Sequence, residues 1–341
     1  MIERAALSGA VCLVKDAREP LVSGAMLDGK NKLVTVFGGG GFIGRYVCEQ
    51  LFDSRARLRV ASRNPRSAYF IQPLAQVGQF GFVQADVGNR DSVRHAVEGA
   101  HMVVNLVGSF KNMKAAHVDG ARHIAEAARD AGVQALVHIS AMSADPKSDS
   151  VYSRTKGEGE AAVRAAFPGA TIIRPSIVFG PEDELTNRLA SMAKLPVLPV
   201  VAPNCRFQPV YVEDLAKAIA KAAIEPAAYA GKTFEIGGPQ VFTMRELTTE
   251  ILKAAGRDTE LVDVPGPLAS AISWLGFLPG APLTRDQWTM LQRDNVAEAG
   301  STGLEAFGVH PTPFAAIAPD WLEMYGGNRF ARRRVNITAI N

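Results

Sequence analysis

Cysteine is scarce in this sequence. Only three of the 341 residues are cysteines, Cys12, Cys48 and Cys205, and no two of them form a CxxC pair. That spacing argues against a disulfide framework and against a cysteine zinc site, and it fits a reducing compartment. The histidines show no ligand spacing either, so we predict no metal site.

An excess of one charge and long apolar runs are also missing. The formal net charge is only +3, which gives no global reason to expect a nucleic-acid partner. No stretch reaches the roughly 18 uninterrupted apolar residues that span a bilayer, so we predict no transmembrane segment. We expect a cytoplasmic protein, with a peripheral position on the inner face of a membrane as the alternative.

Residues 1–30 precede the first strand-like run and carry no clear pattern. The stretch Ala5–Val14 is apolar but short, and no charged segment and cleavage site frame it as a signal peptide. We therefore expect either a poorly ordered extension or a translation start at Met26 instead of Met1.

The sequence does contain a regular alternation of short apolar runs and helical patterns up to about residue 180. Hydrophobic residues make up 47% of the chain, which is ordinary for a protein with a large core. Strand, helix and strand in succession predict an α/β fold of Rossmann type, with a doubly wound parallel sheet. The expected strands are Leu33–Phe37, Arg57–Arg63, Gly81–Val87, His101–Gly108, Ala135–Ser140 and Thr171–Gly180.

Glycines cluster between the first expected strand and the helical pattern that begins at Phe42. Gly38, Gly41 and Gly44 form G-x-x-G-x-x-G, and Phe42 and Ile43 would open the helix. In such a turn the first glycine allows the bend, the second lets the backbone approach a pyrophosphate, and the third packs helix on strand. The strand before and the helix after make a dinucleotide site the better interpretation than a flexible turn.

The end of the second expected strand indicates which dinucleotide. An acid that would bind the ribose 2′-hydroxyl of NAD is missing there, and Arg63 stands beside Ser62 and Asn64. A cation with hydroxyl and amide donors suits a 2′-phosphate, so we predict NADP(H) over NAD(H). A solvated surface arginine is the alternative. Further expected contacts at the carboxyl ends of the third and fourth strands are Asp86, Val87, Asn105, Val107 and Gly108.

A Y-x-x-x-K pair follows the fifth expected strand. Tyr152 and Lys156 would share one face of a helix, because they are four residues apart. A lysine ammonium stabilises a phenolate, so the tyrosine could act as acid or base, and the lysine could also bind the nicotinamide ribose. An ordinary solvated pair is the alternative.

These motifs resemble the extended or atypical short-chain dehydrogenases/reductases. Within that superfamily the chain is most similar to the NADPH-binding accessory subunit of respiratory complex I and its bacterial relatives. The strings that carry the resemblance are RNPRSAYF, NLVGSF, HVDGARHIAEAA, SRTKGEGEAAVRAAFP and RPSIVFGPEDELTNRLASM. The resemblance implies that Gly38 to Gly44 bind the phosphates, that Arg63 binds the 2′-phosphate, and that Tyr152 and Lys156 form the acid/base pair.

One departure from the family pattern concerns catalysis. Active members place a serine or threonine beside the substrate carbonyl at the end of the fifth strand, and Ala141 stands nearest that slot here. Ser140 is the replacement we assign to the catalytic set, with Ser143 as the other candidate. Because a lost hydroxyl removes a donor to the developing oxyanion, two functions remain open. The first is a nucleotide held for structure or sensing, with a link to quinone metabolism; the second is an active NADPH-dependent reductase, dehydrogenase or sugar-nucleotide epimerase.

Prolines become frequent after residue 180, which predicts a smaller C-terminal α/β lobe. We expect a dinucleotide-binding core over 31–180, a lobe over 181–325 interleaved with it, and a basic tail over 326–341. Trp274, Leu275, Phe277 and Leu278 cluster in the lobe, as a packed lid or as a surface for a membrane or partner. With the basic run Arg329–Val335, this cluster makes a membrane surface an expected partner besides the dinucleotide, and the resemblance to the accessory subunit implies a respiratory complex as the other.

Overall fold

The computed structural model describes residues 28–274, 276 and 283–326. Most of the expected N-terminal extension, Leu275, Phe277, Leu278 and the basic run Arg329–Val335 lie outside the described residues. Among the residues that are described, no helix is both long enough and apolar enough to cross a membrane.

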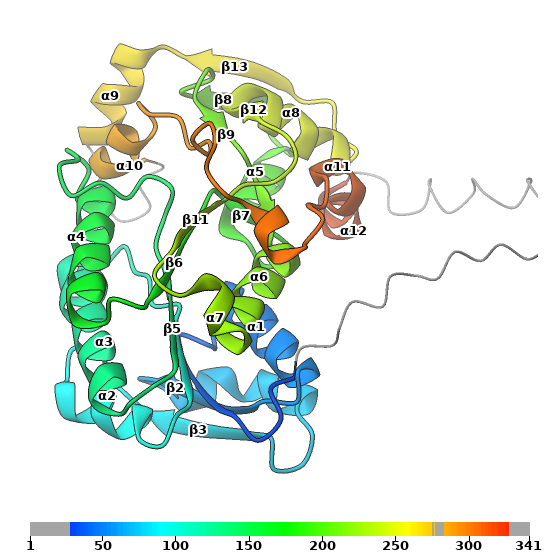
Figure 1. The fold of residues 1–341 in the computed structure, drawn as a ribbon. Coiled ribbons are helices and arrows are strands. Elements are labelled where there is room, and N and C mark those ends of the chain that lie inside the picture. The colour runs from blue at the N-terminus through cyan, green and yellow to red at the C-terminus, as the bar shows by residue number, and fades with distance from the viewer. Residues whose placement is uncertain (1–27, 275, 277–282, 327–341) are drawn as a thin grey trace, which may run out of the picture.

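A seven-stranded parallel sheet forms the centre of the molecule, in the order β11-β6-β5-β4-β1-β2-β3 (Figure 1). Its strands are β1 (Leu33–Phe37), β2 (Arg57–Ser62), β3 (Phe80–Gln84), β4 (Met102–Asn105), β5 (Ala135–Ile139), β6 (Thr171–Pro175) and β11 (Thr233–Ile236). The order reverses between β1 and β4, where doubly wound sheets open a crevice for ligands. The predicted Rossmann-type fold is therefore confirmed.

Helices cover both faces of this sheet, because the buried strands need apolar cover on each side. On one face lie α2 (Arg90–Val97), α3 (Gly120–Asp130) and α4 (Val151–Ala166), and on the other α1 (Phe42–Asp53), α6 (Val212–Ile224) and α7 (Pro226–Tyr229). The alanine-rich faces of α3 and α6 are buried, so these helices pack close to the strands. Short 3₁₀ and π turns complete this half at η1 (Pro65–Leu74) and η2 (Ala115–Asp119).

The C-terminal half builds a smaller lobe above the carboxyl ends of the strands (Figure 1). Its strands form three two-stranded ladders: β7 (Val178–Phe179) with β10 (Val210–Tyr211), β9 (Arg206–Phe207) with β12 (Phe242–Thr243), and β8 (Val197–Val201) with β13 (Glu260–Val264). Its helices are α5 (Glu184–Met192), α8 (Met244–Ala254), α9 (Gly266–Trp274), α10 (Arg285–Met290), α11 (Phe314–Ile317) and α12 (Pro319–Leu322), with 3₁₀ turns η3 (Leu304–Phe307) and η4 (Glu323–Tyr325).

Three features of the sheet differ from the expected strands. The strands end earlier than expected, so Arg63, Asp86, Val87, Val107 and Gly108 lie in the loops that follow β2, β3 and β4. The expected sixth strand Thr171–Gly180 is split, because its second part leaves the sheet and pairs with β10 as β7. The seventh strand, β11, comes from the C-terminal half and pairs with β6.

Candidate functional site

The glycine loop between β1 and α1 forms a tight turn. Gly38 has φ of +80°, which L-residues with a side chain rarely adopt, and its carbonyl accepts a hydrogen bond from Gly41 N at 3.0 Å. A Cβ at Gly44 would lie 2.4 Å from Gly38 O, so only glycine allows the helix to pack this closely on the turn. The first and third glycines thus take the geometry expected of them.

The start of α1 is open for a ligand. Gly41 is the N-cap residue and provides no side-chain cap, so the first-turn amides of Phe42, Ile43 and Gly44 have no intrahelical acceptors. A Cβ at Gly41 would meet only Gly38 O within 4 Å, at 3.3 Å, so the backbone here faces free space. Free amides at a helix N-terminus fit a pyrophosphate.

The loop after β2 contains Arg63, and the hydrogen bonds that order this loop do not involve the Arg63 guanidinium. Ser62 Oγ accepts a hydrogen bond from Asn64 N at 3.3 Å, and Asn64 O accepts one from Ser67 Oγ at 2.7 Å. Arg63 itself is exposed, and within the described residues its guanidinium makes no hydrogen bond or ion pair. Arg66, also exposed and unpaired in the same part of the chain, lies three residues further on. Two cations are therefore available at this corner.

The loops after β3 and β4 are fixed by internal hydrogen bonds. Asp86 Oδ1 accepts from Gly88 N at 3.0 Å, and the Val87 carbonyl lies 2.9 Å from His123 Nδ1. Asn105 is buried, and its Oδ1 accepts from Val107 N at 3.0 Å. The Asn105 amide thus shapes the β4 loop.

His138 on β5 is the second partner of Asn105. Its Nδ1 lies 3.0 Å from Asn105 Nδ2. Burial, with Lys156 and His117 nearby, lowers the pKa of His138 to about 3, so the ring is neutral. A neutral ring can accept the amide hydrogen of Asn105, which holds the carboxyl end of β4 against β5.

Tyr152 and Lys156 lie together on α4 as expected. Lys156 is buried, and its Nζ donates to Ile139 O at 3.1 Å and lies 3.9 Å from the position of a Cβ at Gly108. Burial lowers the pKa of Lys156 to about 8, and nearby Glu160 acts in the opposite direction. Burial raises the pKa of Tyr152 to about 12. The lysine therefore lies at the carboxyl edge between β4 and β5.

His117 is a site residue that sequence reasoning missed. Its Nε2 accepts from Ser109 N at 3.1 Å, its Nδ1 lies 3.0 Å from Thr155 Oγ1, and its ring meets that of Tyr152 edge-on. Burial, with the charge of Lys156, lowers the pKa of His117 to about 4, so Nδ1–H donates to the threonine. The one signal in the sequence is Gly159 inside a helical pattern, where a Cβ would lie 2.1 Å from His117 O.

The N-terminus of α4 is capped from both halves of the molecule. Ser150 Oγ accepts from Ser153 N at 3.3 Å, and Asp286 of α10 accepts from Val151 N at 2.6 Å and Tyr152 N at 3.1 Å. Figure 1 shows α9 and α10 beside this end of α4. The C-terminal lobe thus holds the first turn of the helix that carries Tyr152.

The hydroxyl expected after β5 has two candidates. Ala141 is buried, as are the hydroxyl oxygens of Ser140 and Ser143, and neither oxygen has a hydrogen-bond partner in the described chain. Ser143 lines the same cavity as Phe110, whose ring stacks on that of Tyr152, whereas Ser140 does not line it. Of the two, Ser143 is therefore the one that can meet a ligand in that cavity.

A cavity of 470 Å³ separates the lobe from the carboxyl edge of the sheet. Phe110, on its wall, stacks on the Tyr152 ring with centroids 4.9 Å apart. The other lining residues come mainly from α5, β8, α8, α9 and α10 and are mostly apolar, with Ser143 and Ile177 from the segments after β5 and β6. Ligand pockets in proteins have this size and character.

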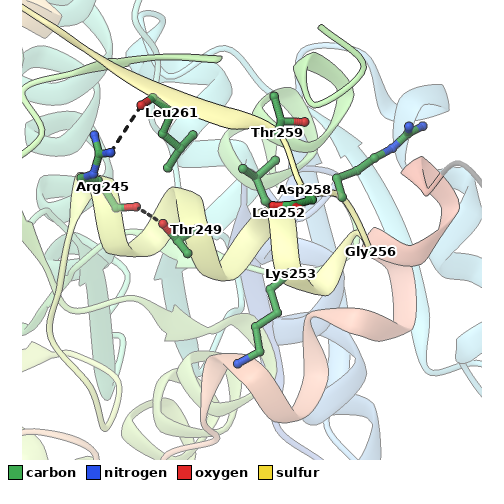
Figure 2. A pocket seen from close by; sticks show the side chains of 9 residues that line it. Arg245, Thr249, Leu252, Lys253, Gly256, Asp258, Thr259 and Leu261 are labelled. Carbon is green, nitrogen blue, oxygen red and sulfur yellow. Dashed lines mark hydrogen bonds between the residues drawn. The ribbon is translucent and has the colours of Figure 1, made fainter. Parts of the chain in front are cut away.

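A second, more open hollow of 590 Å³ lies between α8 and β13, on the far side of the lobe (Figure 2). Its cations have partners: Arg245 pairs with Asp263, Lys253 with Glu250, and Arg257 Nε donates to Tyr325 O. It lies away from the glycine loop and from Tyr152, so we assign it no role. No cluster of metal-ligating side chains occurs in the described parts of the chain.

Comparison with known proteins gives the family context. Residues 34–237 match the model of the NAD dependent epimerase/dehydratase family. The mouse protein named NADH dehydrogenase (ubiquinone) 1 alpha subcomplex subunit 9, mitochondrial, is 35% identical over 298 residues, which cover 82% of this chain and 77% of the mouse protein. A ceramide reductase of Caulobacter vibrioides is 30% identical over 272 residues, covering 76% and 79%.

Solved structures agree in fold. The NADPH complex of an NADPH-dependent quinone oxidoreductase from Escherichia coli has a TM-score of 0.69 at 21% identity, covering 83% of this chain and 97% of that one. A triphenylmethane reductase from Citrobacter reaches 0.70 at 18% identity, covering 85% and 99%. At this identity the likeness concerns the fold alone.

Proposed function

The chain belongs to the NAD dependent epimerase/dehydratase family of extended short-chain dehydrogenases/reductases, and we propose that it binds NADP(H) across the crevice between β1 and β4. Its homologues include the complex I accessory subunit and bacterial reductases. In this proposal Gly38, Gly41, Phe42, Ile43 and Gly44 cradle the pyrophosphate. The remaining proposed contacts are Ser62, Arg63, Asn64, Asp86, Val87, Asn105, Val107, Gly108, Tyr152 and Lys156.

The open N-terminus of α1 is the observation that carries this proposal. Gly41 leaves three amides free and gives the backbone room on the ligand side. An oxygen-rich anion there gains hydrogen bonds and the positive end of the helix dipole. No side chain of the described residues fills the same space.

The preference for NADP(H) over NAD(H) rests on Arg63. Its guanidinium is exposed and unpaired within the described residues, at the end of β2 where the adenosine ribose is expected. A bond between a guanidinium and a phosphate is charge-assisted and therefore favours the nucleotide with the 2′-phosphate.

We further propose that the nucleotide serves structure or sensing, as an accessory subunit of the complex I type would use it. The support is the state of the acid/base pair: the pKa of Tyr152 is raised to about 12, and Lys156 Nζ donates to Ile139 O. A tyrosine that holds its proton this firmly is a weak general acid, and little of it is present as the phenolate that a general base requires. We also propose contact with a respiratory complex or a membrane surface at the inner face, and a link to quinones. The support for the respiratory complex and the quinone link is the relatives' names, which contain NADH dehydrogenase and ubiquinone.

An active NADPH-dependent reductase, dehydrogenase or sugar-nucleotide epimerase is the second candidate. Bound NADPH would supply a hydride, and Tyr152 would then donate the proton to the substrate oxygen while Lys156 and a serine hydroxyl orient it. The specific observation in its favour is Ser143, whose buried hydroxyl lacks a partner in the described chain and which lines the same cavity as Phe110, the ring stacked on Tyr152.

One experiment tests the common part of both candidates. The protein is purified under mild conditions, and any nucleotide that it carries is identified by mass spectrometry. Bound NADP(H) supports the proposal, and titration with NADPH should raise the melting temperature, because the ligand stabilises only the native state. The proposal is contradicted if the purified protein carries no nucleotide and its melting temperature does not change with NADPH or NADH. Exchange or oxidation of the bound nucleotide then separates turnover from structural binding.

A further inference from the structure

We propose that the 470 Å³ cavity binds the hydrocarbon chain of an amphiphile whose carbonyl head lies at Ser143, beside Tyr152. This inference rests on the proposed function, because the head would lie where the second candidate places its substrate. It adds the class of that ligand: a carbonyl group on a long apolar chain.

The wall of the cavity is the first argument. Leucine, isoleucine, methionine, valine and phenylalanine side chains from four helices and three strands contribute most of its surface. Removing apolar surface from water is favourable, at about 0.8 kcal/mol for each methylene group. A ligand that fills this space with methylene groups gains the most.

The polar side chains on the wall give the second argument, because most of them already make a hydrogen bond or an ion pair with the protein. Arg293 pairs with Asp145 and Asp294 with Arg206. Asn295 Oδ1 accepts from Ser176 Oγ at 2.7 Å.

Two further polar residues of the wall bond to the backbone. Thr248 Oγ1 donates to Met244 O at 2.7 Å, and Gln287 Oε1 accepts from Thr284 N at 3.0 Å. A ligand that brings many hydroxyls or phosphates into this cavity would leave most of them without a hydrogen-bond partner, which disfavours its binding.

Ser143 gives the third argument, because it differs from those residues. Its Oγ is buried and has no partner in the described chain, so it can donate to one oxygen of a ligand. Phe110, on the same wall, stacks on the Tyr152 ring. Ser143 is therefore a hydrogen-bonding residue of the wall whose buried hydroxyl has no partner among the described residues.

The test uses the full chain with NADPH present and a series of methyl ketones whose alkyl chain lengthens from butyl to undecyl. Binding is measured by calorimetry. We expect the dissociation constant to fall by about fourfold for each added methylene until the cavity is full, with a negative heat-capacity change. A dissociation constant that does not depend on chain length, or tighter binding of UDP-glucose than of the longest ketone, overturns the proposal.

A second arm identifies the head group. The decyl methyl ketone is compared with a ubiquinone analogue that carries the same decyl tail. Binding of either ligand supports the proposal. Tighter binding of the ketone assigns a small carbonyl head, and tighter binding of the analogue assigns a quinone ring. If neither ligand binds, the proposal is overturned. Ser143→Ala should weaken the better ligand by about two- to tenfold, as expected for one lost hydrogen bond. An unchanged dissociation constant in that variant rejects the placement of the head at Ser143.

A matched pair of variants on α9 locates the chain. Ala269 is buried on the cavity wall, whereas Leu268 beside it is 53% exposed and does not line the cavity. Ala269→Phe should abolish binding of the long ketones, and Leu268→Phe should leave it unchanged. NADPH binding is measured for both variants as a control, because it requires a folded protein and an intact dinucleotide site but no free cavity. If the wild-type protein binds NADPH but none of the ketones, this inference is rejected and the proposed NADP(H) binding is not.

Discussion

The carboxylate of Asp286 caps the helix that carries Tyr152. It accepts hydrogen bonds from the backbone N–H groups of Val151 and Tyr152 itself, at 2.6 and 3.1 Å, across more than 130 residues of sequence. Because α10 also contributes Gln287 and Met290 to the cavity wall, this contact connects that wall to the helix that carries Tyr152 and Lys156.

Asp286→Ala should therefore destabilise the protein by about 1–2 kcal/mol, since two amides lose their acceptor and the helix dipole loses a nearby anion. Urea denaturation gives the free energy of unfolding. Asp149→Ala is the matched control: Asp149 is exposed next to the same helix start, and in the described chain its carboxylate makes no hydrogen bond. Equal effects of the two changes would show that charge alone matters.

Gly41→Val should abolish NADPH binding and leave the sheet folded, because the side chain would occupy the space beside the free amides of α1. Binding is followed by the quenching of intrinsic fluorescence. Gly81→Val is the control, since a Cβ there meets nothing within 4 Å and lies on β3. Wild-type affinity in Gly41→Val would refute the pyrophosphate assignment.

Arg63→Ala should weaken NADPH binding more than NADH binding, by about ten- to a hundredfold in the ratio, because only NADPH carries the 2′-phosphate. Both dissociation constants are measured by calorimetry. Arg66→Ala serves for comparison, because Arg66 is also exposed and lies three residues further on, in η1. If Arg63→Ala weakens both nucleotides alike, Arg63 does not contact the phosphate.

Tyr152→Phe separates the two candidate functions. If the nucleotide is structural, the variant should bind NADPH as the wild type does, while Lys156→Ala binds it more weakly through lost ribose contacts. Our expectation is this pattern. Ketones, quinones and nucleotide sugars are screened for NADPH oxidation. Turnover that Tyr152→Phe abolishes would instead establish an enzyme.

His117 should make the protein sensitive to mild acid. Its pKa is about 4 in the folded state against 6.5 for an ordinary histidine, so between these values the unfolded chain binds a proton that the folded chain does not. Stability is therefore lost as the pH falls from 6.5 towards 4. His117→Gln should flatten this dependence in melting curves. An identical pH dependence in the variant would contradict the buried neutral ring.

The local sequence determined the parts of the site that a few neighbouring residues build. Gly38 and Gly44 predict a tight turn. Gly38 allows its positive φ, and Gly44 allows the helix to pack closely on it. The spacing of Tyr152 and Lys156 places both on one side of a helix, because α-helical geometry is local. Alternating apolar runs were enough for the doubly wound sheet, since both faces of each strand must be buried.

Tertiary structure decided what depends on residues far apart in the chain. Nothing in the sequence near β6 indicates that β11 will extend the sheet, or that Asp286 will cap α4. His117 became a site residue only because a π turn directs its ring towards Ser109 and Thr155. Only the cavity distinguishes Ser143, which lines it, from Ser140, which does not, and the wall of that cavity comes mostly from the C-terminal lobe. Long-range packing sets all of these contacts, and short sequence patterns do not encode it.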